Sequence, residues 1–135
     1  SFEAPHKGGL ILDAREARAL VEAIDHPRAR LIFDVGHHLR AGWSLADAWA
    51  VVGRWVDHVH LKDQAGGRGC YPLGTGAVDF AAFLRLAAGS GYAGGFSLEF
   101  PDAAETVPGV TDLLRRSRDF LLNLNPSIPC PGTSK

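Results

Sequence analysis

Each of four short apolar runs in the sequence ends on a residue that can bind a metal ion: Glu3, Asp34, His60 and Glu99. Three carboxylates and one imidazole suit Mn²⁺ or Mg²⁺ first, and Co²⁺ or Zn²⁺ as well. Gathered in one place, the carboxylates would repel one another unless a cation lay among them. Any one of the four is equally well explained as a polar residue where a loop begins, but four in phase favour a divalent-metal site.

The elements that must position these residues alternate between strand and helix. Apolar runs predict four strands, at residues 1–4, 30–35, 56–62 and 96–100. Stripes of helical period predict helices that begin after Asp13, Ser44 and Asp79, and a last helix over residues 110–122. This alternation predicts parallel strands joined by right-handed crossovers. The carboxyl ends of such strands meet at one end of the sheet, so the four candidate ligands are expected to lie together.

The two-residue period of a strand predicts which side chains share a face. His60 and Lys62 share one face of their strand, opposite Val59 and Leu61. The same alternation in the neighbouring strands puts the acidic ligands on that polar face. We therefore expect the apolar residues to meet the helices and the polar ones to face the inside of the fold.

Three further residues are candidates for binding a substrate. His37 lies just past the second strand, where it could contact a substrate oxygen, and Lys62 ends the third strand, suited to a hydroxyl or a phosphate. Arg68 lies in a Gly-rich loop and could close on an anionic substrate, although a solvated loop arginine explains it equally well. Asp63 could orient Lys62 or merely cap the loop that follows.

Composition excludes several classes of protein. The chain has 135 residues, of which 46% are hydrophobic, so it is not a disordered segment. Its formal net charge of −1 argues against a protein that binds nucleic acid through bulk charge. No apolar run predicts a membrane span, and the pattern of a signal peptide is missing, so a cytoplasmic location is expected. Cys70 and Cys130 lie too far apart to suggest a metal knuckle or a disulfide framework.

Two architectures fit this alternation: an open doubly wound sheet and a (β/α)8 barrel. No strand-to-helix turn carries a G-x-G-x-x-G or P-loop motif, so the nucleotide-binding form of the open sheet has no support. Barrels average about 250 residues, so four βα units make about half of one. The sequence has no methionine and opens on Ser-Phe-Glu, which predicts a piece of a longer protein.

Four short motifs, in order and at matching spacing, resemble the xylose isomerase-like TIM barrel superfamily. They are LIFDVGH at residues 31–37, HVHLKD at 58–63, PLGTGAVDF at 72–80 and SLEF at 97–100. Within the superfamily they resemble the sugar phosphate isomerase and epimerase branch. The resemblance runs from Glu3 to about residue 122 and implies an α/β fold in which residues 1–122 form the C-terminal half of a TIM barrel. Residues 123–135 carry three prolines and no helical period, which predicts a flexible tail.

The resemblance also implies roles for individual residues. Glu3, Asp34, His60 and Glu99 would be the metal ligands, Glu3 and Glu99 would also be the acid/base pair, and His37 would contact the substrate. The implied reaction is isomerisation or epimerisation of a sugar, sugar phosphate or keto-polyol, by removal of a proton next to a carbonyl through an enediolate.

Other activities stay open at this point. Thr75 stands where the family often has Glu, which leaves specificity open, and a dehydratase of the inosose or dehydroshikimate type would use the same site. An endonuclease IV-like phosphodiesterase would need further His ligands after His60, the last His of the chain, and a basic groove. We expect neither nucleic acid nor a membrane as a partner. Because a half-barrel leaves open sheet edges, the chain could form a homodimer, need the N-terminal half of a barrel, or be an inactive fragment.

Overall fold

The computed structural model describes residues 1–3, 9–66, 68–100 and 107–124. Its main sheet has four strands in the order β1 (Phe2–Glu3), β2 (Leu31–Asp34), β3 (Val56–Leu61) and β6 (Gly95–Leu98). Every neighbouring pair in this sheet is parallel, which confirms the arrangement predicted from the alternation of strands and helices.

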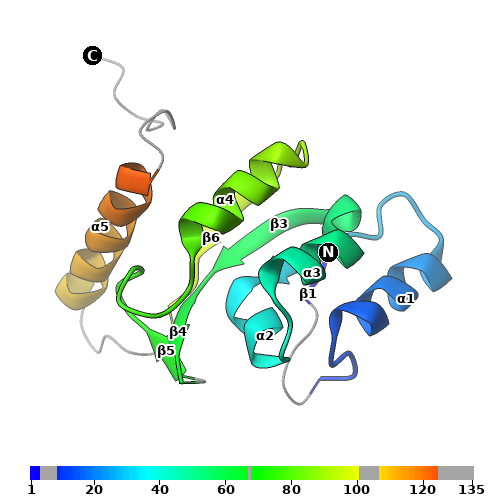
Figure 1. Ribbon diagram of the computed structural model, residues 1–135, viewed down its shortest axis with the longest axis horizontal. Coiled ribbons are helices and arrows are strands. Elements are labelled where there is room, and N and C mark those ends of the chain that lie inside the picture. Colours follow the sequence, from blue (N-terminus) through cyan, green and yellow to red (C-terminus); the bar gives the residue numbers. More distant parts are fainter. Residues whose placement is uncertain (4–8, 67, 101–106, 125–135) are drawn as a thin grey trace.

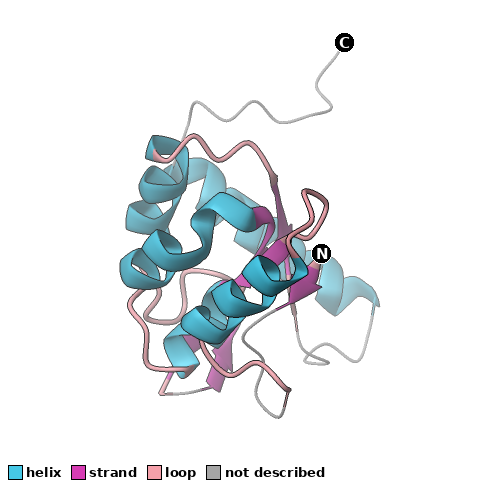
Figure 2. Cartoon of the chain, turned by 90° about the vertical axis from the view of Figure 1, so that its right-hand side faces the viewer, coloured by secondary structure: helices cyan, strands magenta, loops and turns pink. Residues whose placement is uncertain are grey.

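Four helices form a row along the sheet: α1 (Ala14–Ile24), α3 (Leu45–Val52), α4 (Phe80–Gly89) and α5 (Val107–Leu124). Figure 1 shows α1 and α5 at the two ends of this row, and Figure 2 shows the same elements from the α1 end. The predicted N-caps are confirmed, because Asp13, Ser44 and Asp79 each accept backbone N–H bonds from the first turn of their helix.

The hydrophobic core lies between the sheet and this row of helices. Leu31 and Phe33 of β2 and Val59 and Leu61 of β3 are buried there. Phe33 stacks on Phe83 of α4, with the ring centroids 5.4 Å apart. The apolar face of the sheet is therefore the helix-facing one, as the two-residue period predicts.

Two features depart from the sequence prediction. A short helix, α2 (Val35–Arg40), follows β2 directly, where a loop is predicted, because six residues with two histidines carry no apolar stripe. Its N-cap is Asp34, whose carboxylate accepts the N–H of His37 at 2.6 Å. The predicted Gly-rich loop contains an antiparallel hairpin of β4 (Asp63–Ala65) and β5 (Arg68–Cys70).

Some boundaries also shift. Strand β6 ends at Leu98, so Glu99 follows the strand directly instead of lying within it. Helix α5 is longer than predicted and includes Asn123 and Leu124, while the rest of the predicted tail, 125–135, lies outside the described residues. Within the described ranges, no helix is long and apolar enough to cross a membrane.

Candidate metal centre

The carboxyl ends of the parallel strands bring Glu3, Asp34, His60 and Glu99 into one cluster. Each residue offers a ligand atom, and these atoms all lie within 4.8 Å of one another. Strand register accounts for this arrangement: Asp34 lies opposite His60, and the Glu99 N–H donates to the Leu61 carbonyl at 3.1 Å. The predicted convergence is therefore observed, while the role of the cluster stays a prediction.

Asp34 is the most enclosed member, with its side chain completely buried. Its two oxygens have different surroundings. Oδ1 accepts the His37 N–H and so begins α2, whereas Oδ2 has no hydrogen-bond partner among the described residues and lies 3.6 Å from Lys62 Nζ. One oxygen thus caps α2, and the other faces Lys62 without a hydrogen bond among the described residues.

His60 directs Nδ1 toward the carboxylates. This nitrogen lies 3.2 Å from Glu99 Oε2 and 3.7 Å from Glu3 Oε1. The ring of His58 packs edge-on against the ring of His60, with the centroids 5.5 Å apart. His58 Nε2 lies 2.8 Å from Ser97 Oγ. His58 therefore supports the imidazole from one layer deeper in the fold.

The pKa values of Asp34 and Glu99 are shifted in opposite directions. Burial, and then contact with the Glu99 carboxyl, raises the pKa of Asp34 to about 7. Burial also acts to raise the pKa of Glu99, but its contacts with Asp34, Lys62 and His60 outweigh this and lower the pKa to about 2. Crowded carboxyl groups behave in this way because one of them keeps a proton, which avoids two facing negative charges.

The donor set fits a divalent cation. Asp34 Oδ2, His60 Nδ1 and Glu99 Oε2 are enclosed polar atoms with no hydrogen-bond partner among the described residues. Burying such atoms without a partner is costly, and they belong to three of the four residues of the cluster. Oxygen ligands with one nitrogen match the preferences of Mn²⁺ and Mg²⁺ and are also accepted by Co²⁺ and Zn²⁺.

The three predicted substrate-binding residues have different positions. His37 is buried at the edge of the cluster, with Nδ1 3.3 Å from Glu3 Oε1, and it comes from α2 instead of the predicted loop. The Lys62 ammonium contacts the carboxylates of Glu99 and Asp34. Arg68 lies exposed in the hairpin strand β5, and its part in substrate binding stays a prediction.

The structure decides the role of Asp63, which sequence reasoning leaves open between orienting Lys62 and capping the loop. Its buried carboxylate accepts the backbone N–H groups of Gln64, Gly74, Gly76 and Val78. A Cβ atom at Gly76 would lie 2.2 Å from Asp63 Oδ1, so the approach needs glycine. Asp63 therefore organises the loop beyond β5, and the glycines after it are the sequence signal for this role.

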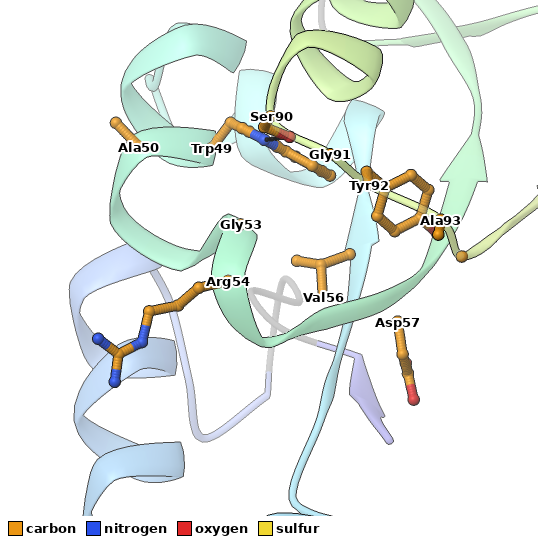
Figure 3. Close-up of a pocket in the computed structure, with 11 residues that line it drawn as sticks. Trp49, Ala50, Gly53, Arg54, Val56, Asp57, Ser90, Gly91, Tyr92 and Ala93 are labelled. Atoms are coloured by element: carbon orange, nitrogen blue, oxygen red, sulfur yellow. Dashed lines mark hydrogen bonds between the residues drawn. The ribbon is translucent and has the colours of Figure 1, made fainter.

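A cavity of about 570 Å³ lies away from the cluster, near the amino ends of β3 and β6 (Figure 3). Three of its polar side chains already have partners: Trp49 Nε1 donates to Ser90 Oγ at 3.0 Å, and the Tyr92 hydroxyl donates to the Gly95 carbonyl at 2.7 Å. None of the four cluster residues lines it. The chemistry-bearing residues therefore lie at the opposite ends of the strands, where parallel α/β folds place their active sites.

Comparison with known proteins agrees with the predicted fold. The sequence profile of the xylose isomerase-like TIM barrel family matches residues 3–124. No match was found among curated proteins. Among solved structures, a 3-keto-D-glucoside 4-epimerase from E. coli is 26% identical with a TM-score of 0.66, over 85% of this chain and 40% of that one.

Two further solved structures are similar. A xylose isomerase domain protein from Planctomyces limnophilus is 25% identical with a TM-score of 0.71, over 83% of this chain and 43% of that one. A probable 3-DHS dehydratase from Bacillus anthracis is 19% identical with a TM-score of 0.71, over 84% of this chain and 46% of that one. The chain thus spans less than half the length of these proteins, and its four βα units form part of a barrel. Since the profile covers most of the sequence, the chain belongs to the xylose isomerase-like TIM barrel family.

Proposed function

We propose that the chain carries the metal-binding part of a divalent-metal-dependent isomerase or epimerase that acts on a sugar or a related keto-polyol. Glu3, Asp34, His60 and Glu99 would hold the ion, with Mn²⁺ or Mg²⁺ as first candidates. The observation that carries this proposal is the convergence of four ligand atoms within 4.8 Å, from the ends of four strands. The enclosed atoms of Asp34, His60 and Glu99 that make no hydrogen bond among the described residues add to it.

The four residues differ in what they can do. When bound, the cation would withdraw electron density from adjacent carbonyl and hydroxyl oxygens of the substrate and acidify the C–H bond between them. Asp34 is completely buried and caps α2, so it suits a fixed ligand. The side chains of Glu3 and Glu99 are 33% and 36% exposed, so a substrate can reach them.

Glu3 and Glu99 suit an acid/base pair because they come from the two outer strands of the sheet. One carboxylate would take a proton from carbon, and the other would return a proton. Return to the opposite face of the same carbon gives an epimer, and return to the neighbouring carbon gives an isomer. His37, 3.3 Å from Glu3, would bind a substrate oxygen beside the reacting carbon, and Arg68 would contact the substrate from the outer hairpin.

Sugar epimerases of similar fold support the proposed substrate class. Solved structures of similar fold include an L-ribulose 3-epimerase and a D-allulose 3-epimerase from Methylomonas sp. in complex with D-allulose. These proteins are each 22% identical to the chain, so they support the fold, and the sugar substrate is a proposal for this chain.

A dehydratase is the second candidate. One carboxylate would remove the proton from the carbon next to a carbonyl, and the other, in its acid form, would protonate a hydroxyl on the following carbon, so that water leaves and a C=C bond forms. The similar fold of the probable 3-DHS dehydratase supports dehydration as the second candidate activity. Loss of water from the substrate, in place of an isomer or epimer, would identify this activity.

The proposal is tested by Mn²⁺ binding and by exchange of carbon-bound hydrogen. Wild type is expected to bind Mn²⁺ in a titration followed by electron paramagnetic resonance. It is also expected to exchange deuterium from solvent into a ketose next to its carbonyl, measured by NMR. Glu99→Gln should lose exchange and weaken Mn²⁺ binding by about tenfold or more, because it removes a charged ligand and a proton acceptor.

The control is Glu22→Gln, which makes the same change on the exposed surface of α1, where Glu22 pairs with Arg18. It should leave both readouts at wild-type values. Exchange by Glu99→Gln at the wild-type rate would remove Glu99 from the acid/base role. Cleavage of an abasic-site duplex by the metal-loaded wild type, with no exchange into ketoses, would favour the phosphodiesterase instead.

A further inference from the structure

Lys62 places the one lysine ammonium of the described ranges inside the ligand cluster. Its side chain is only 10% exposed. Nζ contacts Glu99 Oε1 in a short ion pair and lies 3.6 Å from Asp34 Oδ2. Lys62 therefore faces two of the four proposed ligands at once, and it comes from the same strand end as His60.

The close approach of Gly36 positions the Lys62 side chain. A Cβ atom at Gly36 would lie 3.0 Å from Lys62 Cδ and 3.3 Å from Lys62 Cγ. The alkyl chain of Lys62 thus packs against the first turn of α2, where only glycine leaves room without displacing it. This contact directs the ammonium to the carboxylates of Asp34 and Glu99 instead of to open solvent.

A count of formal charges shows what this ammonium supplies. With a cation bound, all three carboxylates (Glu3, Asp34 and Glu99) are counted as ionised, because ligand binding displaces the proton that one of them keeps otherwise. They contribute −3, a divalent cation contributes +2, and the sum is −1. Lys62 contributes +1 and brings the sum to zero. Without Lys62, the same ligand set would be balanced by a trivalent ion. An enclosed site favours neutrality because uncompensated charge is costly where little water can screen it.

We propose that Lys62 is the fixed counter-ion of the cluster and matches it to divalent cations. This role rests on the proposed metal site and goes beyond the substrate contact expected from the sequence. The ammonium reduces the negative charge that surrounds the ion, because the three carboxylates and Lys62 together carry −2 instead of −3. The Lys62 ammonium therefore disfavours a trivalent ion more strongly than a divalent one. This preference for divalent ions arises from charge alone, since the ligand atoms are the same for both ions.

The test compares the affinities for Mn²⁺ and Tb³⁺ in wild type and in Lys62→Met, which keeps an unbranched side chain but removes the charge. Mn²⁺ is followed by electron paramagnetic resonance and Tb³⁺ by its luminescence. We expect Lys62→Met to shift the ratio of the two dissociation constants toward Tb³⁺ by about tenfold or more, because a unit charge close to the ion repels the trivalent ion more strongly. Lys62→Gln should shift the ratio in the same direction, and Lys62→Arg should keep the wild-type ratio.

The matched control is Arg85→Met, which removes one positive charge from the exposed surface of α4 and should leave the ratio unchanged. A parallel loss of both affinities in Lys62→Met and Lys62→Gln, with the ratio constant, would overturn the counter-ion role and indicate a purely structural one. Failure of wild type to bind either ion would refute the proposed metal site itself. Binding of both ions by wild type with no change of ratio in the variants would refute only the role of Lys62.

Discussion

His38 makes the stability of the fold depend on pH in a way that one substitution isolates. The side chain is completely buried in α2 and stacks on Phe33, with ring centroids 4.0 Å apart. Burial lowers the pKa of His38 from 6.5 to about 3, and nearby His37 acts in the same direction, whereas Asp13 acts against it. Neither ring nitrogen has a hydrogen-bond partner among the described residues, so the imidazole is held neutral by packing.

The sign and size of the effect follow from linkage. Between pH 6.5 and pH 3, the unfolded chain binds a proton at His38 that the folded chain does not, so the free energy of unfolding falls as the pH falls. The loss approaches about 1.4 kcal/mol for each pH unit in this window. Between pH 7 and pH 5, His38 alone is expected to remove about 2 kcal/mol of stability.

The substitution is His38→Phe, because phenylalanine has a similar shape, can stack on Phe33 and cannot titrate. It loses no hydrogen bond, so stability at pH 7 should stay equal or increase. The loss of stability between pH 7 and pH 5 should then be about 2 kcal/mol smaller than in wild type. The measurement is urea unfolding at both pH values, followed by tryptophan fluorescence, with a chelator present in every sample.

The matched control is His26→Phe, at an exposed position after α1, which leaves the buried imidazole of His38 in place and should lose as much stability as wild type between pH 7 and pH 5. Comparing differences between variants cancels the contributions of Asp34 and the other carboxyl groups. If His38→Phe loses as much stability as wild type between pH 7 and pH 5, the buried neutral imidazole is the wrong explanation.

Two further predictions concern the loop and the sheet edges. In Asp63→Asn, an amide NH₂ group takes the place of one carboxylate oxygen, which accepts two backbone N–H groups. The free energy of unfolding in urea should therefore fall by about 2–6 kcal/mol. Asp79→Asn, at an N-cap that tolerates either residue, should cost little, and equal small losses in the two variants would contradict the role of Asp63. The open edge strands β1 and β6 expose Phe2 and Phe96, so the isolated chain should associate as its concentration rises in sedimentation velocity. A compact monomer at every concentration would contradict this expectation.

Much of the fold could be predicted because its determinants are local. The N-caps Asp13, Ser44 and Asp79 mark where three helices begin, and their hydrogen bonds in the structure agree with that reading. The alternation of Val59 and Leu61 with His60 assigns the two faces of β3. These signals need only neighbours along the chain, so periodicity and capping chemistry are enough to detect them.

The convergence of the candidate ligands also follows from the sequence, for a topological reason. Residues that end parallel strands must lie at the same end of the sheet, whatever the details of packing. The positions of Asp34 and His60 in the sequence therefore predict that they become neighbours, and the observed register pairs them directly. The sequence pattern says which residue types meet, and hence which metal ions suit them.

Only the tertiary structure decided how individual side chains are used. It turned the loop after Asp34 into α2, committed Asp63 to backbone N–H groups of a loop more than ten residues away, and directed Lys62 to Glu99. Each of these contacts joins segments that are distant in the sequence or depends on the close approach of a backbone, as at Gly36. A periodic pattern reports the direction in which a side chain leaves its strand. The partner that it meets depends on which other segments fold over it, and packing alone decides that.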